Sequence, residues 1–112
     1  MEKSKEVATK TYSLRVTENA LQNIDNITGY IAYIMHETLN AIRVGDEILK
    51  TFDRIENNPL AFRECEGIPT VNKIYRKAIC LSWIIIYKIK PAEIVILGII
   101  HGHRRPRSSE WV

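Results

Sequence analysis

The sequence predicts an α+β domain in which a hairpin of two helices packs on one face of a largely antiparallel sheet of four strands. Three patterns predict this fold: an alternating segment at 11–17, two adjoining helical repeats between 18 and 58, and three strand-like segments between 73 and 101. Helices that adjoin in sequence, followed by strands that form a meander, are typical of the α+β class.

The first strand is predicted by its alternation. Tyr12, Leu14 and Val16 would face one side of residues 11–17, and polar side chains the other. This pattern is typical of a strand with one buried face. Thr17 can cap the helix that follows, because its hydroxyl oxygen can accept a backbone N–H of the first helical turn.

The two helices are predicted by apolar residues that recur at alternating spacings of four and three, which places them on one side of an α-helix. The first helix ends near His36 and carries this stripe at Ala20, Ile24, Ile27, Ile31 and Ile34. The second carries it at Ala41, Gly45, Ile48, Phe52 and Ile55. Residues 57–59, Asn-Asn-Pro, end the second helix, because the residue before a proline avoids helical geometry. With only Glu37 and Thr38 between them, the helices must pack antiparallel.

Residues 59–72 are predicted to be a loop, because Pro59, Gly67 and Pro69 interrupt a polar segment. Three strands follow, at roughly Lys73–Ile79, Leu81–Lys90 and Glu93–His101. A tight turn at 90–93 makes the last two strands antiparallel, whereas no Gly, Asn or Pro marks the break between the first two. The middle strand is apolar on both faces for most of its length, so we expect it at the centre of the sheet with part of each face covered.

The length and composition indicate one globular domain. The chain has 112 residues, enough for a core of its own. We expect residues 1–10 to form a loose N-terminal arm and residues 11–112 to form the single domain. The polar N-terminus does not resemble a signal peptide, and charged residues and a proline interrupt the apolar run at 80–100, which excludes a membrane span. We therefore expect a soluble, cytoplasmic protein.

The net charge is unevenly distributed along the chain. Residues 1–59 hold seven Lys or Arg against nine Asp or Glu, a net charge of −2, whereas residues 60–112 hold nine against four, a net charge of +5. A basic C-terminal half suits an acidic protein segment or a nucleic acid, and charge alone does not choose between them.

The last twelve residues, 101–112, carry the strongest functional signal in the sequence. They follow the apolar segment 94–100 and bring His101, His103, three arginines and Trp111 to one edge of the fold. Clustered arginines repel one another unless solvent or an anionic partner is close. A solvated basic tail would explain the arginines. Trp111 favours a binding role, because a purely solubilising tail has no need of a tryptophan.

Six short segments carry a resemblance to a known family. They are Thr17-Glu-Asn-Ala20, Tyr30-Ile31, Ile55-Glu-Asn-Asn-Pro59, Tyr75-Arg76, Ile84-Ile-Ile-Tyr-Lys88 and Ile99-Ile-His-Gly-His-Arg104. With these segments in this order, over about residues 11–105, the chain resembles the RelE/ParE superfamily of toxins from type II toxin–antitoxin modules. The resemblance implies the fold described above and a role as the toxin of such a module, of the kind that stabilises plasmids.

The superfamily has two activities, and the resemblance favours the non-catalytic one. RelE-like members cleave messenger RNA on the ribosome, whereas ParE-like members bind and inhibit DNA gyrase. RelE-like members have an arginine in the central strand, and this chain has Ile84 at that position. They also have a pair of basic residues on the preceding strand, where this chain has Arg76 and Ala78. Arg104 matches a C-terminal arginine, while Trp111 falls near a tyrosine position and has no titratable hydroxyl. One missing transition-state donor costs about a hundredfold or more in rate, so a ParE-like activity is expected.

Two alternatives stay open. Some relatives use histidine and glutamate, so a ribosome-dependent mRNA endonuclease would use His101 or His103 as a general base near neutral pH. Arg76 and Arg104 would then supply cations for the phosphate. A solvated strand end is the simpler interpretation of the two histidines. The second alternative is a degenerate member that binds an antitoxin without being toxic. Two histidines with no third ligand fall short of a metal site, and we expect no metal and no cofactor.

The resemblance also implies the partners. An antitoxin would wrap the toxin with a C-terminal helix or strand, giving a toxin–antitoxin hetero-oligomer, and DNA gyrase would be the target. The basic C-terminal half predicts an acidic antitoxin segment, with an association that weakens as salt rises. The residues expected to bind partners are Arg63, Arg76, Arg104, Arg105 and Trp111.

Overall fold

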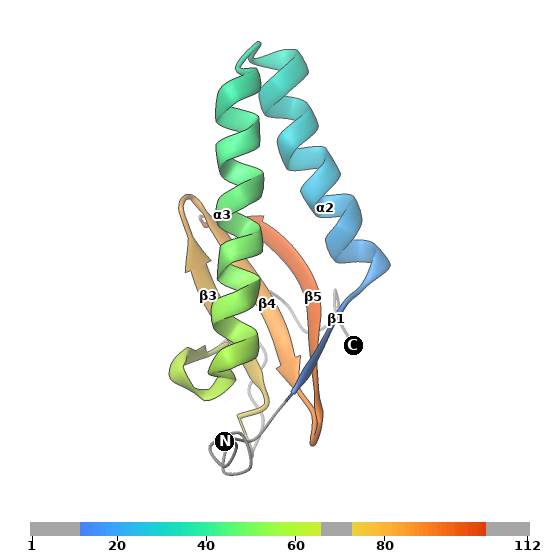
Figure 1. Ribbon diagram of the computed structural model, residues 1–112, viewed down its shortest axis with the longest axis vertical. Coiled ribbons are helices and arrows are strands. Elements are labelled where there is room, and N and C mark those ends of the chain that lie inside the picture. The colour runs from blue at the N-terminus through green and yellow to red at the C-terminus, as the bar shows by residue number, and fades with distance from the viewer. Residues whose placement is uncertain (1–11, 66–72, 103–112) are drawn as a thin grey trace, which may run out of the picture.

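The computed structural model describes residues 12–65 and 73–102. Helices α2 (Glu18–Gly29) and α3 (Thr38–Asn57) form an antiparallel hairpin that lies on one face of a five-stranded sheet (Figure 1). The strands are β1 (Ser13–Val16), β2 (Arg63–Glu64), β3 (Tyr75–Cys80), β4 (Trp83–Ile89) and β5 (Glu93–His101). The predicted α+β class, with a helix hairpin packed on a sheet, is confirmed.

The sheet is mixed and has five strands, where the sequence predicted four that were largely antiparallel. The strand order is β1-β5-β4-β3-β2. Strand β2 pairs antiparallel with β3 and lies inside the segment 59–72 that was predicted as a loop. It is too short for alternation to reveal. Strand β1 runs parallel to β5, and this direction could not be read from the sequence, because no short turn links the two strands.

The first helix begins at a cap that also joins it to the sheet. The Thr17 hydroxyl oxygen accepts the backbone N–H of Ala20 at 3.1 Å, which confirms the predicted cap. The same hydroxyl is also a donor: it lies 2.9 Å from the carbonyl oxygen of Ile96 and 3.1 Å from the carbonyl oxygen of Leu97, and its proton is directed to these two acceptors. One side chain therefore fixes the start of α2 against β5.

The tip of the hairpin departs from regular α-helix. A π-helical segment, Tyr30–Ile34, continues α2, and the chain turns at His36 with a φ of 58°, near the predicted helix end. In Figure 1 the tip projects beyond the end of the sheet. Neither helix in the described ranges combines the length and apolar content needed to cross a bilayer.

Two apolar clusters cover the two faces of the sheet. The larger lies between the hairpin and the sheet, and Tyr12, Leu14 and Val16 pack against it as predicted. The smaller, on the opposite face, consists of Cys65, Tyr75, Ile84, Ile86 and Ile100. Strand β4 contributes to both clusters and lies in the middle of the strand order, which confirms its predicted central position.

The turn between β3 and β4 is the one that no sequence signal marked. Cys80 pairs with Trp83, so Leu81 and Ser82 form the connection. Leu81 has a φ of 56°, in the left-handed region that glycine or asparagine adopts more readily.

Candidate partner-binding surfaces

Arg76 lies on β3 and is held by the chain's own backbone. Its guanidinium donates to the carbonyl oxygens of Lys73 at 2.8 Å, Leu60 at 3.2 Å and Phe62 at 2.8 Å. These three acceptors lie in the segments that lead into β2 and β3. Arg76 therefore fixes the position of β2, in addition to any contact with a partner.

Tyr87 of β4, across the strand pair from Arg76, is a structural hydrogen-bond donor. Its side chain is fully buried, and its hydroxyl donates to the carbonyl oxygen of Pro59 at 2.6 Å. Burial raises the pKa of Tyr87 well above the usual range of a tyrosine, and the positive charge of Arg76 opposes this only in part. The hydroxyl consequently stays protonated at neutral pH and is poorly suited to act as a general base.

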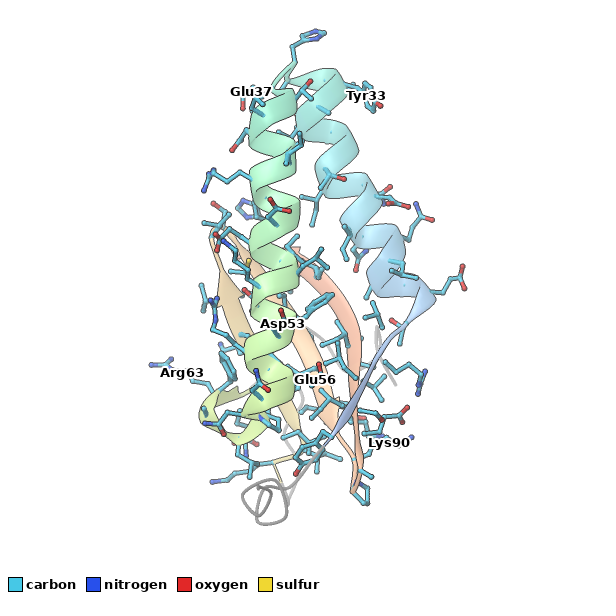
Figure 2. All side chains as sticks on the ribbon, in the orientation of Figure 1. Tyr33, Glu37, Asp53, Glu56, Arg63 and Lys90 are labelled. Carbon is cyan, nitrogen blue, oxygen red and sulfur yellow. The ribbon has the colours of Figure 1, made fainter. Side chains whose placement is uncertain are left out.

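Arg63 is exposed on β2 and lies opposite Lys77 of β3. Alternation along β3 places Lys77 on the same side as Tyr75, the side turned away from the hairpin. Directly paired residues of antiparallel strands share a face, so Arg63 lies there too. Figure 2 shows its side chain projecting from the edge of the molecule. This position makes it accessible to a partner.

His101 ends β5 and lies opposite Trp83 of β4. The two rings meet edge to face, with their centroids 6.2 Å apart. Both residues line a cavity of about 460 Å³ beneath the hairpin tip, together with Ile27, Tyr30 and Met35. Its lining is mainly apolar, and the ring of Trp83 also packs against the main core.

The structure does not bring Arg76 and His101 together. Arg76 pairs with Tyr87 on one side of β4, whereas His101 pairs with Trp83 on the other side. Tyr87 and Trp83 are about 13 Å apart along the strand, at roughly 3.3 Å per residue. Arg76 and His101 are therefore too far apart to contact the same phosphate group. The remaining predicted site residues, His103, Arg104, Arg105 and Trp111, lie outside the described residues, as does the arm at 1–10.

Ile84, the position that matches an arginine in RelE-like toxins, lies in an apolar environment. It is 7% exposed and belongs to the smaller cluster with Ile86 and Ile100. A guanidinium at this position would need water or an anion for its N–H groups. The surroundings of Ile84 are those of a packing residue.

Sequence reasoning missed a group of cations on the sheet face turned away from the hairpin. A cavity of about 550 Å³ on this face is lined by Arg15, Lys88 and Lys90, with Tyr75 among its other residues. Arg15 and Lys90 form ion pairs with Glu93 at 3.0 Å and 3.8 Å, and the Lys88 ammonium lies 5.4 Å from the centre of the Tyr75 ring. The alternation of β1 and β4 was the signal that could have placed these cations on one face.

No cluster suited to a metal ion is present in the ranges 12–65 and 73–102. Within them, no three side chains of His, Cys, Asp or Glu come close enough together to hold a metal. The surfaces described above therefore offer apolar contact and positive charge, which suit protein or nucleic-acid partners.

Comparisons with known proteins agree with this fold. The family described as "ParE toxin of type II toxin-antitoxin system, parDE" has a model that matches residues 14–106. The fold is similar to that of a chain in the chromosomal ParDE system of P. aeruginosa, with a TM-score of 0.64 and 20% identity over 83% of this chain and 98% of that one. It is also similar to a chain of the RelBE2 toxin–antitoxin complex of Mycobacterium tuberculosis, with a TM-score of 0.57 and 15% identity over 81% and 98% of the two chains. No curated protein sequence matches the chain.

Proposed function

The chain belongs to the family of ParE toxins of type II toxin–antitoxin systems, and from this premise we propose that it acts by binding and inhibiting DNA gyrase and is neutralised by a cognate antitoxin. Gyrase is the target that the ParE-like resemblance implies. The activity requires a protein-binding surface and no catalytic group.

One observation supports a non-catalytic mechanism. Among the described residues, the side chains that would cleave RNA are either replaced by apolar residues or already hydrogen-bonded within the fold. Ile84 is packed in an apolar cluster, and the Arg76 guanidinium is bound to three carbonyl oxygens. The Tyr87 hydroxyl is buried against the carbonyl of Pro59. Phosphoryl transfer from a 2′-hydroxyl needs a base, an acid and cations that converge on the phosphate, and these side chains do not converge.

We assign antitoxin binding to the basic residues of the C-terminal half. Arg63 is exposed, and the sequence places Arg104, Arg105 and Trp111 beyond the end of β5. Arg76 would contribute by holding β2, and with it Arg63, in position. An acidic antitoxin segment would complement this charge, and the P. aeruginosa and M. tuberculosis relatives belong to toxin–antitoxin systems.

The proposal is tested by assaying one purified sample of the full chain twice. The first assay measures supercoiling by DNA gyrase, and the second is a translation reaction in which the message is probed for cuts. Inhibited supercoiling with intact message is the expected result, and addition of the antitoxin should restore supercoiling. Cut message with unaffected gyrase would overturn the proposal in favour of a nuclease. Neither effect would indicate a non-toxic member.

A ribosome-dependent mRNA endonuclease is the second candidate, and one observation favours it. The sheet face turned away from the hairpin carries Arg15, Lys77 and Lys88, which could follow an RNA backbone. In that case His103, which lies outside the described residues, would be the base, because His101 lines the cavity on the hairpin side of the sheet. A His101→Gln, His103→Gln double variant would then lose message cleavage, whereas gyrase inhibition would not depend on imidazole chemistry.

A further inference from the structure

The tip cavity is the space of about 460 Å³ beneath the hairpin tip that Tyr30, Met35, Trp83 and His101 help to line. The proposed function makes no use of it. Its walls come from three separate parts of the chain: α2 with the π-helical segment that continues it, the first turn of α3, and the paired ends of β4 and β5. A cavity of this size, bounded by several elements and mainly apolar, is typical of small-molecule sites.

The π-helical segment shapes one wall of the tip cavity. A backbone hydrogen bond runs from the N–H of Met35 to the carbonyl oxygen of Tyr30, five residues earlier. Residues five apart point about 140° away from each other in an α-helix, whereas a turn closed over five residues brings them towards the same side. Tyr30 and Met35 therefore both line the cavity, together with the buried Ile31. Short π-helical segments of this kind are frequent at functional sites.

The lining of the tip cavity favours an uncharged, aromatic ligand. Trp83 and Tyr30 contribute rings, and Met35 contributes a thioether. Among the described residues that line the cavity there is no Asp, Glu, Lys or Arg, in contrast to the cations that line the cavity on the opposite face of the sheet. A charged ligand would lose hydration here without gaining an opposite charge. An aromatic ligand would instead gain contacts with the rings and with the sulfur atom.

Two asparagines at the tip cavity set a further requirement on the ligand. The side-chain oxygen of Asn26 accepts the side-chain N–H of Gln22 at 3.2 Å. Within the described ranges, the side-chain nitrogen of Asn26 makes no hydrogen bond. Asn40, by contrast, is engaged at both ends of its amide, by Glu37 and Arg43. The Asn26 amide is therefore a donor available to a ligand, and a hydroxyl or carbonyl oxygen would accept it.

We propose that the tip cavity binds a small, neutral, flat aromatic molecule of about two or three rings that carries a hydroxyl or carbonyl oxygen at one edge. The rings would contact Trp83, Tyr30 and Met35, and the oxygen would accept the Asn26 amide. Such a ligand would bridge the hairpin tip and the sheet, so its binding stabilises the folded chain. This inference goes beyond the proposed function, because it assigns a small-molecule site that neither gyrase inhibition nor antitoxin binding requires.

The test uses the full chain and N-phenyl-1-naphthylamine, an uncharged aromatic dye whose fluorescence rises in apolar sites. Its matched probe is 8-anilinonaphthalene-1-sulfonate, the same ring system with one sulfonate group. We expect saturable binding of the neutral dye, about fivefold or more tighter than that of the sulfonate, with an affinity that does not change between about 50 and about 300 mM NaCl. The neutral dye should also raise the melting temperature of the chain. Tighter binding of the sulfonate, or no saturable binding of the neutral dye, would overturn the proposal.

Matched variants locate the neutral dye on the chain. Tyr30→Ala removes an aromatic wall and should weaken binding about fivefold or more, whereas Tyr33→Ala, in the same π-helical segment but outside the cavity lining, should not. Met35→Glu adds a charge at the cavity and should also weaken binding, whereas Leu39→Glu, outside the lining, should not. All four side chains are exposed, so the variants should keep the fold, which circular dichroism checks. If cavity and control variants have the same effect, the dye binds elsewhere and the proposal is wrong.

A second pair of ligands tests the polar contact. Naphthalene and 1-naphthol differ by one hydroxyl group, and both should displace the dye. The naphthol should bind about threefold or more tightly than naphthalene, and this advantage should disappear in Asn26→Ala. Gln22→Ala leaves the Asn26 amide in place and should keep the advantage. Equal affinities in the parent chain, or an advantage that persists in Asn26→Ala, would contradict the assigned contact.

The variant Trp111→Phe tests whether the chain's own C-terminal segment occupies the tip cavity. The neutral dye should bind this variant and the parent chain with the same affinity. If it binds only the variant, the segment beyond β5 fills the cavity, and the proposal of a small-molecule ligand is overturned.

Discussion

The side-chain oxygen of Asn23 accepts the backbone N–H of Ile99 at 2.9 Å. Asn23 lies on α2 and Ile99 on β5, beyond the point where β1 stops pairing with that strand. The helix thus supplies an acceptor that a neighbouring strand would otherwise provide, and Asn19 does the reverse by donating to the Leu97 carbonyl. Side chains of α2 replace the missing length of β1.

This contact predicts that Asn23→Ala lowers the free energy of unfolding by about 1–3 kcal/mol, because the amide of Ile99 would lose its partner at a partly buried position. Asn26→Ala is the matched control, since Asn26 is an exposed asparagine on the same helix. Urea unfolding followed by circular dichroism measures both. Equal effects of the two substitutions would mean that helix propensity, and not the contact with β5, determines the result.

Tyr87 makes stability depend on pH in the alkaline range. Its folded-state pKa lies above the unfolded value of about 10, because burial disfavours the phenolate. The unfolded chain therefore releases the phenolic proton first as the pH rises. The stability that this group contributes is complete below pH 10 and is lost between pH 10 and the raised folded pKa, by up to about 1.4 kcal/mol for each pH unit.

We expect the unfolding free energy to fall more steeply between pH 9.5 and 11 in the parent chain than in Tyr87→Phe, which has no proton to release. At pH 7 the same substitution should cost about 1–2 kcal/mol, because the Pro59 carbonyl loses its buried donor. Urea titrations at several pH values measure both effects. If the unfolding free energies of the two proteins fall in parallel with pH, Tyr87 does not cause the loss of stability in the alkaline range.

Substitutions at Arg76 and Arg63 should have different effects, with Arg76 contributing to stability and Arg63 to antitoxin binding. Arg76→Met removes a donor shared by three carbonyl oxygens and should cost about 2 kcal/mol of unfolding free energy. Arg63→Glu changes an exposed side chain and should stay within about 0.5 kcal/mol, while slowing association with the antitoxin. Stopped-flow mixing and urea unfolding on both variants provide the comparison. A large loss of stability in Arg63→Glu would contradict the assignment.

The fold followed from the sequence wherever a repeating pattern ran for a full element. The four–three spacing placed both helices, and β5 begins and ends where its apolar run predicted. The features that the sequence did not predict lack such a pattern. Strand β2 has only two residues. The bulge in β5 near Leu97 lies inside an unbroken apolar run, where nothing marks an extra residue. A strand of two residues is set by its partner strand, so only the tertiary structure reveals it.

The candidate site was less predictable for a related reason. Arg76 was predicted to bind a partner or, in a nuclease, to supply a cation for the phosphate. Its acceptors at Leu60 and Phe62 lie 16 and 14 residues earlier in the chain, in a segment with no regular pattern. Arg15 and Lys88 meet on one face only because β1 and β4 both flank β5. Side chains gathered by sheet order cannot be grouped until that order is known.

The basic residues beyond β5 should act mainly on the rate of antitoxin association. Arg104→Glu with Arg105→Glu reverses two charges, and we expect the association rate at low salt to fall about tenfold or more, with a smaller change in the dissociation rate. The difference should fade as added salt screens the charges. Surface plasmon resonance at several salt concentrations measures both rates. An unchanged association rate at low salt would remove these arginines from the interface.

The turn between β3 and β4 stores strain that a substitution can relieve. Leu81 adopts a φ of 56°, which costs an L-residue with a bulky side chain roughly 1 kcal/mol. Asparagine tolerates this geometry, and Leu81 is 44% exposed, so little packing is lost. Leu81→Asn should therefore raise the unfolding free energy by about 0.5–1 kcal/mol, whereas Ser82→Asn, which alters the neighbouring turn residue without positive φ, should not. Thermal and urea unfolding of both variants measure this, and a destabilised Leu81→Asn would show that the leucine side chain contributes more through packing than its backbone strain costs.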